Sequence, residues 1–250
     1  MVALLYHNVG PVDAEECRGL SVLPETFARQ IAALAAMGYR TVSASEWSAH
    51  VRGGASVPRH PIMITFDDCY ADLPAYAFPT LDKHGFSATV FVPTSLVGRS
   101  IPCSPGASSG LPIMPADTIA EWAARGIEFG AHSRTHADLS RLPEDVVLDE
   151  MQGSKEALSE IIGRPVAAFA YPYGRADAVS RRLAGELFDT AFTIEEGIND
   201  QTTPLTGLRR TMVQHGDSRV DVCLRARFGM SILERVRTAA AGTRRSAAPA

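Results

Sequence analysis

Two adjacent carboxylates follow an apolar segment of this 250-residue chain. Asp67 and Asp68 come directly after Ile62 to Phe66, a run that is typical of a buried strand. Because successive side chains of a strand point to opposite sides, we expect the two aspartates to serve different functions rather than share one proton. The alternative, about as frequent, is that one of them caps a helix over Ala71 to His84.

Two histidines four positions apart follow another apolar segment. His132 and His136 come after Ile127 to Gly130, which also has the pattern of a strand. An isolated pair with this spacing is a surface coincidence about as often as a pair of metal ligands. Combined with a carboxylate at the end of a strand, however, the pair forms a three-ligand set that leaves a coordination position open for water.

A third segment ends in the turn Tyr171-Pro172-Tyr173-Gly174. Proline stiffens such a turn and glycine permits close approach, so the turn can direct a backbone N–H at a developing oxyanion. Taken alone, an ordinary aromatic turn is the more frequent outcome.

The elements that must position these residues alternate along the whole chain. Helical spacing of apolar residues predicts helices over Pro24 to Met37 and Pro143 to Ile162, and Asp117 is expected to cap a helix over Thr118 to Arg125. The candidate strands are Val2 to Tyr6, Tyr39 to Ser43, Ile62 to Phe66, Ala88 to Val92, Ile127 to Gly130, Ala167 to Tyr171, Thr190 to Ile194 and Leu208 to Val213. This alternation predicts an α/β fold in which a parallel sheet closes into a barrel within one domain.

Two segments do not fit the alternation. Gly98 to Pro115 is rich in Gly, Pro and Ser, and we expect an insertion without regular structure that forms a lid or a substrate-binding wall. The domain is therefore expected over residues 1–236, with 98–115 as a loop insertion and 237–250 as a disordered tail.

Composition and charge exclude several classes of protein. The formal net charge is -4 and there is no run of like charges, so neither nucleic acid nor a membrane surface is an expected partner. The first residues, Met1 to His7, lack the features of a signal peptide, and we expect a cytoplasmic location.

The four cysteines are scattered, which predicts reduced, separate thiols rather than a disulfide or a thiolate metal site.

The three motifs together resemble those of the polysaccharide deacetylases of carbohydrate esterase family 4, the NodB homology domain. That family has T-F-D-D, H-[ST]-x-x-H and R-x-P-[YF] in this order, and the chain has Thr65 to Asp68, His132 to His136 and Ala170 to Tyr173. The resemblance spans about Leu4 to Phe228. It is strongest to the exopolysaccharide-modifying branch, in which a Y-H strand comes first, as Tyr6-His7 does here.

The resemblance implies a distorted (β/α)7-type barrel with a divalent metal, zinc in the first place and cobalt or nickel as alternatives. Asp68, His132 and His136 would hold the metal, and Asp67 would act as general base. The backbone N–H of Tyr173 would stabilise the oxyanion, with Tyr171 and Pro172 beside the substrate. His7 is our preferred general acid, and His215 is the second candidate.

The chain also departs from the family pattern. Ala170 stands where the family has the arginine that orients the base, and Arg209 and Arg210 are the nearest candidates to replace it or to bind substrate. Cys69 stands where the family has glycine, either as a packing residue or as a site of oxidation. No D-x-x-x-W motif is found.

The expected activity is hydrolysis of an N-acetyl group on an amino sugar or glycoside, with a small molecule or an oligosaccharide as substrate. One alternative is removal of a formyl group from a formamido sugar, since the same attack by water serves both acyl groups. The other is a carbohydrate-binding barrel that keeps its metal but has lost catalysis, an idea motivated by Ala170.

Overall fold

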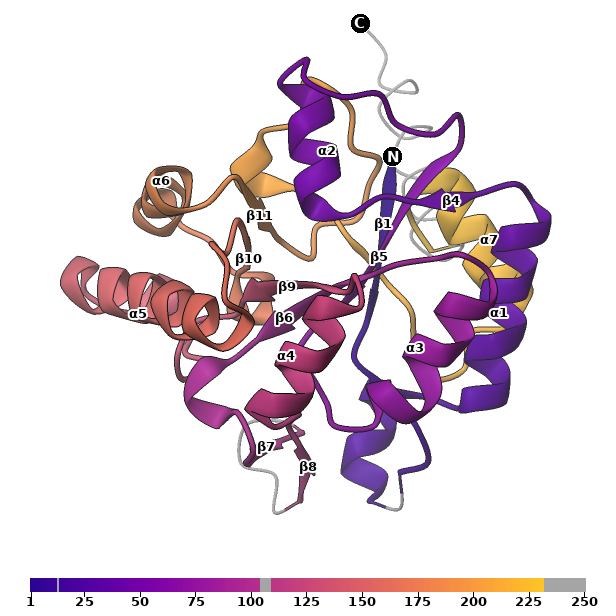
Figure 1. Cartoon of the computed structure of the whole chain (residues 1–250), viewed down its shortest axis with the longest axis horizontal. Coiled ribbons are helices and arrows are strands. Elements are labelled where there is room, and N and C mark those ends of the chain that lie inside the picture. The colour runs from indigo at the N-terminus through magenta and orange to yellow at the C-terminus, as the bar shows by residue number, and fades with distance from the viewer. Residues whose placement is uncertain (13, 104–108, 232–250) are drawn as a thin grey trace, which may run out of the picture.

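One mostly parallel sheet organises the chain (Figure 1). The structure, a computed structural model, describes residues 1–12, 14–103 and 109–231. Every pairing within the large sheet is parallel, and the strand order is β11-β10-β9-β6-β5-β1-β12, with β4 beside β5. These strands are β1 (Val2–Tyr6), β4 (Arg40–Thr41), β5 (Pro61–Phe66), β6 (Thr89–Val92), β9 (Glu128–Ala131), β10 (Ala168–Ala170), β11 (Thr190–Phe192) and β12 (Thr211–Met212).

The segment before β12 brings the two edges of the sheet together. Leu208 forms a parallel bridge with Phe192 of β11, and three residues later Thr211 pairs with Leu4 of β1. The sheet therefore curls into a distorted (β/α) barrel in one domain, as the alternation of elements predicts.

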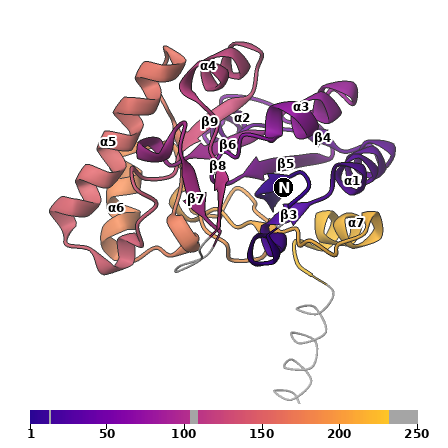
Figure 2. The same cartoon turned by 90° about the horizontal axis from the view of Figure 1, so that it is seen from below.

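Helices surround the sheet, which is clearest from below (Figure 2). Pro24 begins α1 in its first turn, as expected for proline, whereas Pro143 caps α5 rather than beginning it. The described helices are α1 (Pro24–Ala36), α2 (Ala44–Val51), α3 (Leu73–Lys83), α4 (Ala116–Ala124), α5 (Glu144–Ile162), α6 (Ala178–Leu187) and α7 (Arg219–Phe228). None of them combines the length and apolar character that crossing a membrane requires.

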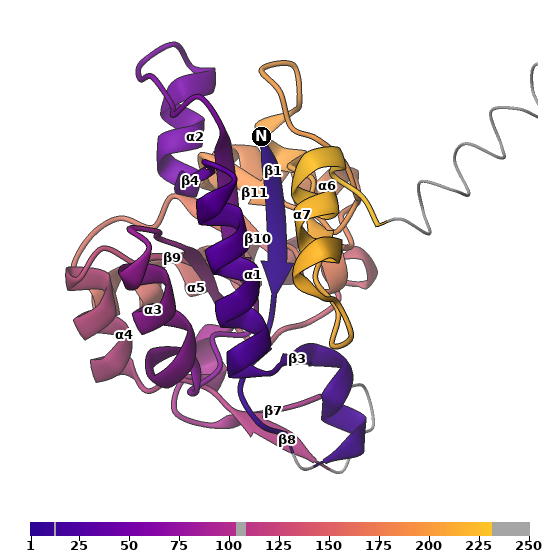
Figure 3. The same cartoon turned by 90° about the vertical axis from the view of Figure 1, so that its right-hand side faces the viewer.

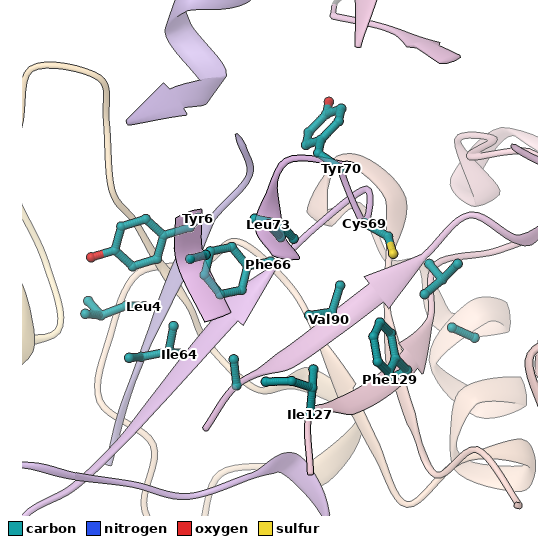
Figure 4. Close-up of a cluster of buried hydrophobic side chains, with 14 of the residues drawn as sticks. Leu4, Tyr6, Ile64, Phe66, Cys69, Tyr70, Leu73, Val90, Ile127 and Phe129 are labelled. Carbon is teal, nitrogen blue, oxygen red and sulfur yellow. The ribbon is translucent and has the colours of Figure 1, made fainter. Parts of the chain in front are cut away.

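Alternation along the strands separates two cores. Leu4, Ile64 and Val90 belong to the large cluster that packs against the helices, part of which is drawn in Figure 4. Met63 and Phe91 belong to a second, smaller cluster inside the barrel. The same period of two puts Thr65 and Asp67 on the interior face with Met63.

Two expectations about local structure were wrong, and a third is not tested. Part of the 98–115 insertion is regular, because β7 (Ser100–Pro102) and β8 (Gly110–Pro112) form an antiparallel hairpin. Pro115, not Asp117, is the N-cap of α4, and the Asp117 carboxylate instead accepts from the N–H of Thr118 within the first turn. The expected tail at 237–250 lies outside the described residues.

The cysteines also differ from expectation, because Cys17 and Cys103 form a disulfide. Spacing could not predict the bond, since 86 positions separate the two residues in sequence. Disulfides persist in oxidising compartments and are rare in the cytosol. The cytoplasmic location that we expected stays a prediction. Cys69 and Cys223 are free thiols.

Candidate active site

Three turns at the carboxyl ends of β5, β9 and β10 carry the candidate residues. Among the described residues, the non-glycine residues with positive φ all lie in these turns: Asp68, Cys69, Ser133, His136 and Tyr173. Such conformations cost about 1–3 kcal/mol each and cluster at functional sites. Neither Asp67 nor Asp68 caps α3, whose N-cap is Asp72, so the capping alternative is wrong.

Asp68, His132 and His136 bring one ligand atom each to a common point, with these atoms all within 4.8 Å of one another. The Nε2 atoms of His132 and His136 lie 3.8 Å and 3.3 Å from Oδ1 of Asp68. Two imidazoles and one carboxylate are a donor set that zinc accepts in catalytic sites.

Two of the three candidate ligands, His132 and Asp68, are oriented by a second contact. Nδ1 of His132 lies 2.7 Å from the carbonyl oxygen of Ala170, which directs Nε2 toward Asp68. Oδ2 of Asp68 accepts a 2.9 Å hydrogen bond from the hydroxyl of Tyr70, while Oδ1 is buried without a hydrogen-bond partner among the described residues. An unpartnered buried carboxylate oxygen beside two imidazoles fits a site built for a cation.

The electrostatic environment keeps His132 neutral. Burial lowers its pKa to about 4, although the negative charges of Asp67 and Asp68 act in the opposite direction. A neutral imidazole has the free lone pair that a metal ligand needs.

The loop that carries His136 is held by a buried glutamate that the sequence did not suggest. Oε2 of Glu150, on α5, accepts from the N–H groups of Arg134 and Thr135 at 2.8 Å and 2.9 Å. Oγ of Ser133 accepts from the N–H of His136 at 2.9 Å, which explains a serine after the first histidine.

Asp67 has a different partner, the wholly buried guanidinium of Arg210. The two side chains form paired hydrogen bonds, with Nη1 2.5 Å from Oδ1 and Nη2 2.8 Å from Oδ2. Burial alone would raise the pKa of Asp67 and is the largest single effect. The charge and hydrogen bonds of Arg210, together with the nearby imidazoles of His132 and His7, outweigh it, and the pKa falls to about 2. Asp67 is therefore an ionised carboxylate inside the protein.

Arg210 occupies the barrel interior in place of a residue on β10. Its guanidinium lies 5.4 Å and 5.8 Å from the ring centres of Phe91 and Phe192, and its Nε donates to the carbonyl of Thr193. Ala170 belongs to the same interior cluster and is small. The family's arginine position on β10 is Ala170 in this chain. An arginine nevertheless reaches Asp67, from the segment just before β12.

A cleft of about 510 Å³ opens over these groups, and it includes two of the proposed catalytic residues besides Asp67. His7, directly after β1, lines the cleft, and so does Tyr173. Gly174 is needed next to Tyr173, because its φ is positive and a Cβ atom there would collide with Ile194.

Other candidates lie away from the cleft. Tyr171 and Pro172 are buried and do not line it, and the hydroxyl of Tyr171 donates to the carbonyl of Thr206. Arg209 is exposed and lies against Gly197, so it does not replace the family arginine. His215 is also outside the cleft, with Nδ1 2.7 Å from the carbonyl of Ser21.

Cys69 is a packing residue in this site. Its side chain is fully buried, and burial, assisted by the charge of Asp68, raises the pKa of the thiol. A buried thiol that stays protonated reacts slowly with oxidants.

Comparison with known proteins agrees with this geometry. The model of the family described as polysaccharide deacetylase matches residues 54–188, which is more than half of the chain. The chain belongs to the polysaccharide deacetylase family. The resemblance inferred from the three motifs is therefore confirmed for the family.

Individual relatives of this polysaccharide deacetylase family member span most of its length. YxkH of Bacillus subtilis strain 168, a protein named for the same family, is 26% identical over 86% of this chain and 72% of its own. Poly-beta-1,6-N-acetyl-D-glucosamine N-deacetylase of Escherichia coli K12 is 24% identical over 87% of this chain, which corresponds to only 37% of that longer protein. The similarity to a deacetylase of poly-N-acetylglucosamine supports the exopolysaccharide branch.

A solved structure of another deacetylase is also similar to the structure of this chain. The Streptococcus pyogenes deacetylase PplD, determined in complex with acetate, superposes with a TM-score of 0.78 at 26% identity and covers 90% of this chain and 96% of its own. The barrel described above is therefore the fold of this family.

Proposed function

We propose that this protein is a metal-dependent deacetylase that hydrolyses N-acetyl groups on amino-sugar residues of a glycan. The observation that carries the proposal is the division between adjacent aspartates. Asp67 is held as an anion by Arg210, whereas Asp68 turns a free oxygen toward His132 and His136. This division matches a base beside a cation site.

The chain's own residues would divide the reaction as follows. A zinc ion held by Asp68, His132 and His136 would supply the positive charge that activates a water and polarises the acyl oxygen. Asp67 would accept the proton of the attacking water, and Arg210 would keep its carboxylate ionised and correctly oriented. The backbone N–H of Tyr173 would donate to the developing oxyanion.

Collapse of the tetrahedral species requires a proton donor for the departing amine. His7 is the proposed acid because it lines the cleft, whereas His215 lies outside it. Acetate would leave as the second product, which agrees with the acetate complex of PplD.

Two alternatives differ in their support. Catalytic impairment was suggested by Ala170, and the contact between Arg210 and Asp67 removes that motivation. Deformylation differs from deacetylation only in the acyl group of the substrate. The experiment below distinguishes the two activities by whether acetate or formate is released.

The test uses zinc-loaded protein with an N-acetylglucosamine oligosaccharide and its N-formyl counterpart. We expect acetate release that is lost on chelation and restored by zinc or cobalt. Asp67→Asn should lose acetate release but retain zinc, while His136→Ala should lose both. Release of formate only, or zinc loss in Asp67→Asn, would contradict the proposed activity or the proposed roles.

A further inference from the structure

Two segments far apart in sequence form part of one wall of the cleft. The 3-10 helix η1 (Glu15–Leu20) ends in Leu20, and strand β7 supplies Ile101, Pro102 and the following Cys103. In Figure 3 the indigo segment that leads into β3 lies beside β7 and β8. We call Leu20, Ile101, Pro102 and Cys103 the cysteine wall.

The disulfide joins these segments directly. Cys17 of η1 is fully buried and bonded to Cys103, with the two Cα atoms 5.1 Å apart. A second link lies nearby, because the N–H of Ser109 donates to the carboxylate of Glu16 at 2.6 Å. The cysteine wall is therefore covalently continuous.

Each segment is also attached to a part of the site. On the hairpin side, the N–H of Ala71 donates to Pro112 and that of Met114 donates to Cys69, next to Asp68. On the other side, β3 (Ser21–Val22) follows η1 and pairs with β2 (Asn8–Val9), directly after His7. The disulfide thus connects the segment after the proposed acid to the segment after the proposed metal ligand.

The chemistry of the cysteine wall fits sugar rings. Leu20, Ile101 and Pro102 present aliphatic carbon, and the faces of pyranose rings expose C–H groups that pack on such surfaces. The wall does not include the candidate metal ligands or Asp67. It is placed to contact sugar residues beside the one that carries the reacting acetyl group.

We propose that the Cys17–Cys103 disulfide holds the cysteine wall as a preformed binding surface for neighbouring sugar residues, and so selects oligomeric over monomeric substrate. This inference rests on the proposed function. A surface that is already ordered binds without the entropic cost of ordering it, whereas two unlinked segments would incur that cost with each substrate.

The test compares wild type with Cys17→Ser/Cys103→Ser, both loaded with zinc. The substrates are a β-1,6-linked N-acetylglucosamine pentasaccharide and the monosaccharide. We expect KM for the pentasaccharide to rise about 10-fold, equivalent to ~1.4 kcal/mol, because the wall must be ordered on binding. The value of kcat, zinc affinity and KM for the monosaccharide should be unchanged.

Two further variants keep the test decisive. Cys223→Ser removes a thiol on α7, away from the cleft, and should behave as wild type. Leu20→Ala trims the wall without removing the disulfide, and it should also raise KM for the pentasaccharide alone. An unchanged KM in both wall variants, or an equal loss for both substrates, would overturn the proposal.

A binding measurement separates this inference from the proposed function. Calorimetry in the Asp67→Asn background measures pentasaccharide affinity whether or not acetate is released. Weaker binding after loss of the disulfide supports the cysteine wall even if wild type is inactive on this glycan. Equal binding, or no binding by either protein, refutes it.

Discussion

Arg210 is the residue that gives Asp67 and Asp68 different properties. The guanidinium is wholly buried, holds both oxygens of Asp67, and lies beside the rings of Phe91 and Phe192. Its planar fork matches a carboxylate in a way that lysine does not. The Asp67 carboxylate is therefore fixed in position by one residue, distant in sequence, from the segment just before β12.

Removing this partner should damage both stability and turnover. Arg210→Met leaves the Asp67 carboxylate buried without its counter-ion, so the free energy of unfolding should fall by about 3–5 kcal/mol. Urea denaturation measures this loss. The free energy of unfolding of Arg210→Lys should lie between those of Arg210→Met and wild type. The exposed neighbour provides a control, since Arg209→Met should change stability by only about 0.5 kcal/mol or less. Equal effects of the two methionine variants would contradict the assigned role.

Asp72 is a second buried carboxylate, and it has no comparable partner. Neither of its oxygens has a hydrogen bond of normal geometry among the described residues. Val9 and Asn8 lie near enough to offset part of the cost of burying the charged carboxylate. Burial therefore raises its pKa from 3.8 to about 6. The folded state favours the protonated acid.

This shift predicts a pH-dependent effect of Asp72→Asn. Because the pKa of Asp72 is higher in the folded state, its contribution to the free energy of unfolding is complete below about pH 4. This contribution is lost as pH rises through about 6. The neutral amide should thus add about 2–3 kcal/mol to the free energy of unfolding at pH 8 and almost nothing at pH 4. Denaturant titrations at both pH values measure the difference, with the exposed Asp82→Asn as control. A gain of equal size at both values would show that ionisation of Asp72 is not its cause.

At the scale of elements, helix α5 organises the histidine loop from outside the barrel. Glu150 lies on its buried face and accepts from Arg134 and Thr135, which stand between the two histidines. The helix is therefore a support for the site as well as part of the core.

Loss of this support should weaken metal binding. Glu150→Ala removes the acceptor of two N–H groups, so we expect a destabilisation of about 1–3 kcal/mol. Zinc affinity should fall about 10–100-fold, as for other contacts that orient metal ligands, and chelator competition measures it. Glu156→Ala, on the exposed face of the same helix, should leave zinc affinity unchanged. Glu150→Gln should be milder, because its carbonyl oxygen can still accept from the loop.

For the whole molecule, the candidate ligands come from the turns after β5 and β9 and join distant parts of the chain. A cation bound only by the folded state should therefore stabilise the entire barrel. Zinc at a free concentration 100 times its Kd should add about 2.7 kcal/mol. For a domain of this size the melting temperature should rise by about 5–10 °C.

Thermal melting with and without zinc measures this effect, and two variants define its origin. His136→Ala should abolish the rise, since it removes one of the three donor groups. His60→Ala removes an exposed imidazole away from the cleft and should retain it. A rise that persists in His136→Ala would place the cation elsewhere.

The sequence by itself determined the strands, the barrel and the three turns that carry the site. This was possible because each motif directly follows its own strand, so the period of two and the position at the strand end are local properties. Alternation along β5 puts Asp67 on the interior side, whereas Asp68 has positive φ and belongs to the turn that follows. The boundaries were less certain: β4 is shorter than Tyr39 to Ser43, since only two residues pair with β5.

Only the tertiary structure decided which distant groups meet. Arg210 is separated from Asp67 by 143 positions, and Cys17 from Cys103 by 86. Whether Arg209 or Arg210 faces the interior depends on the register of one residue at the closing segment, and a shift of one would exchange them. Contacts of this kind are set by how the sheet closes and where its loops cross, which local spacing does not encode.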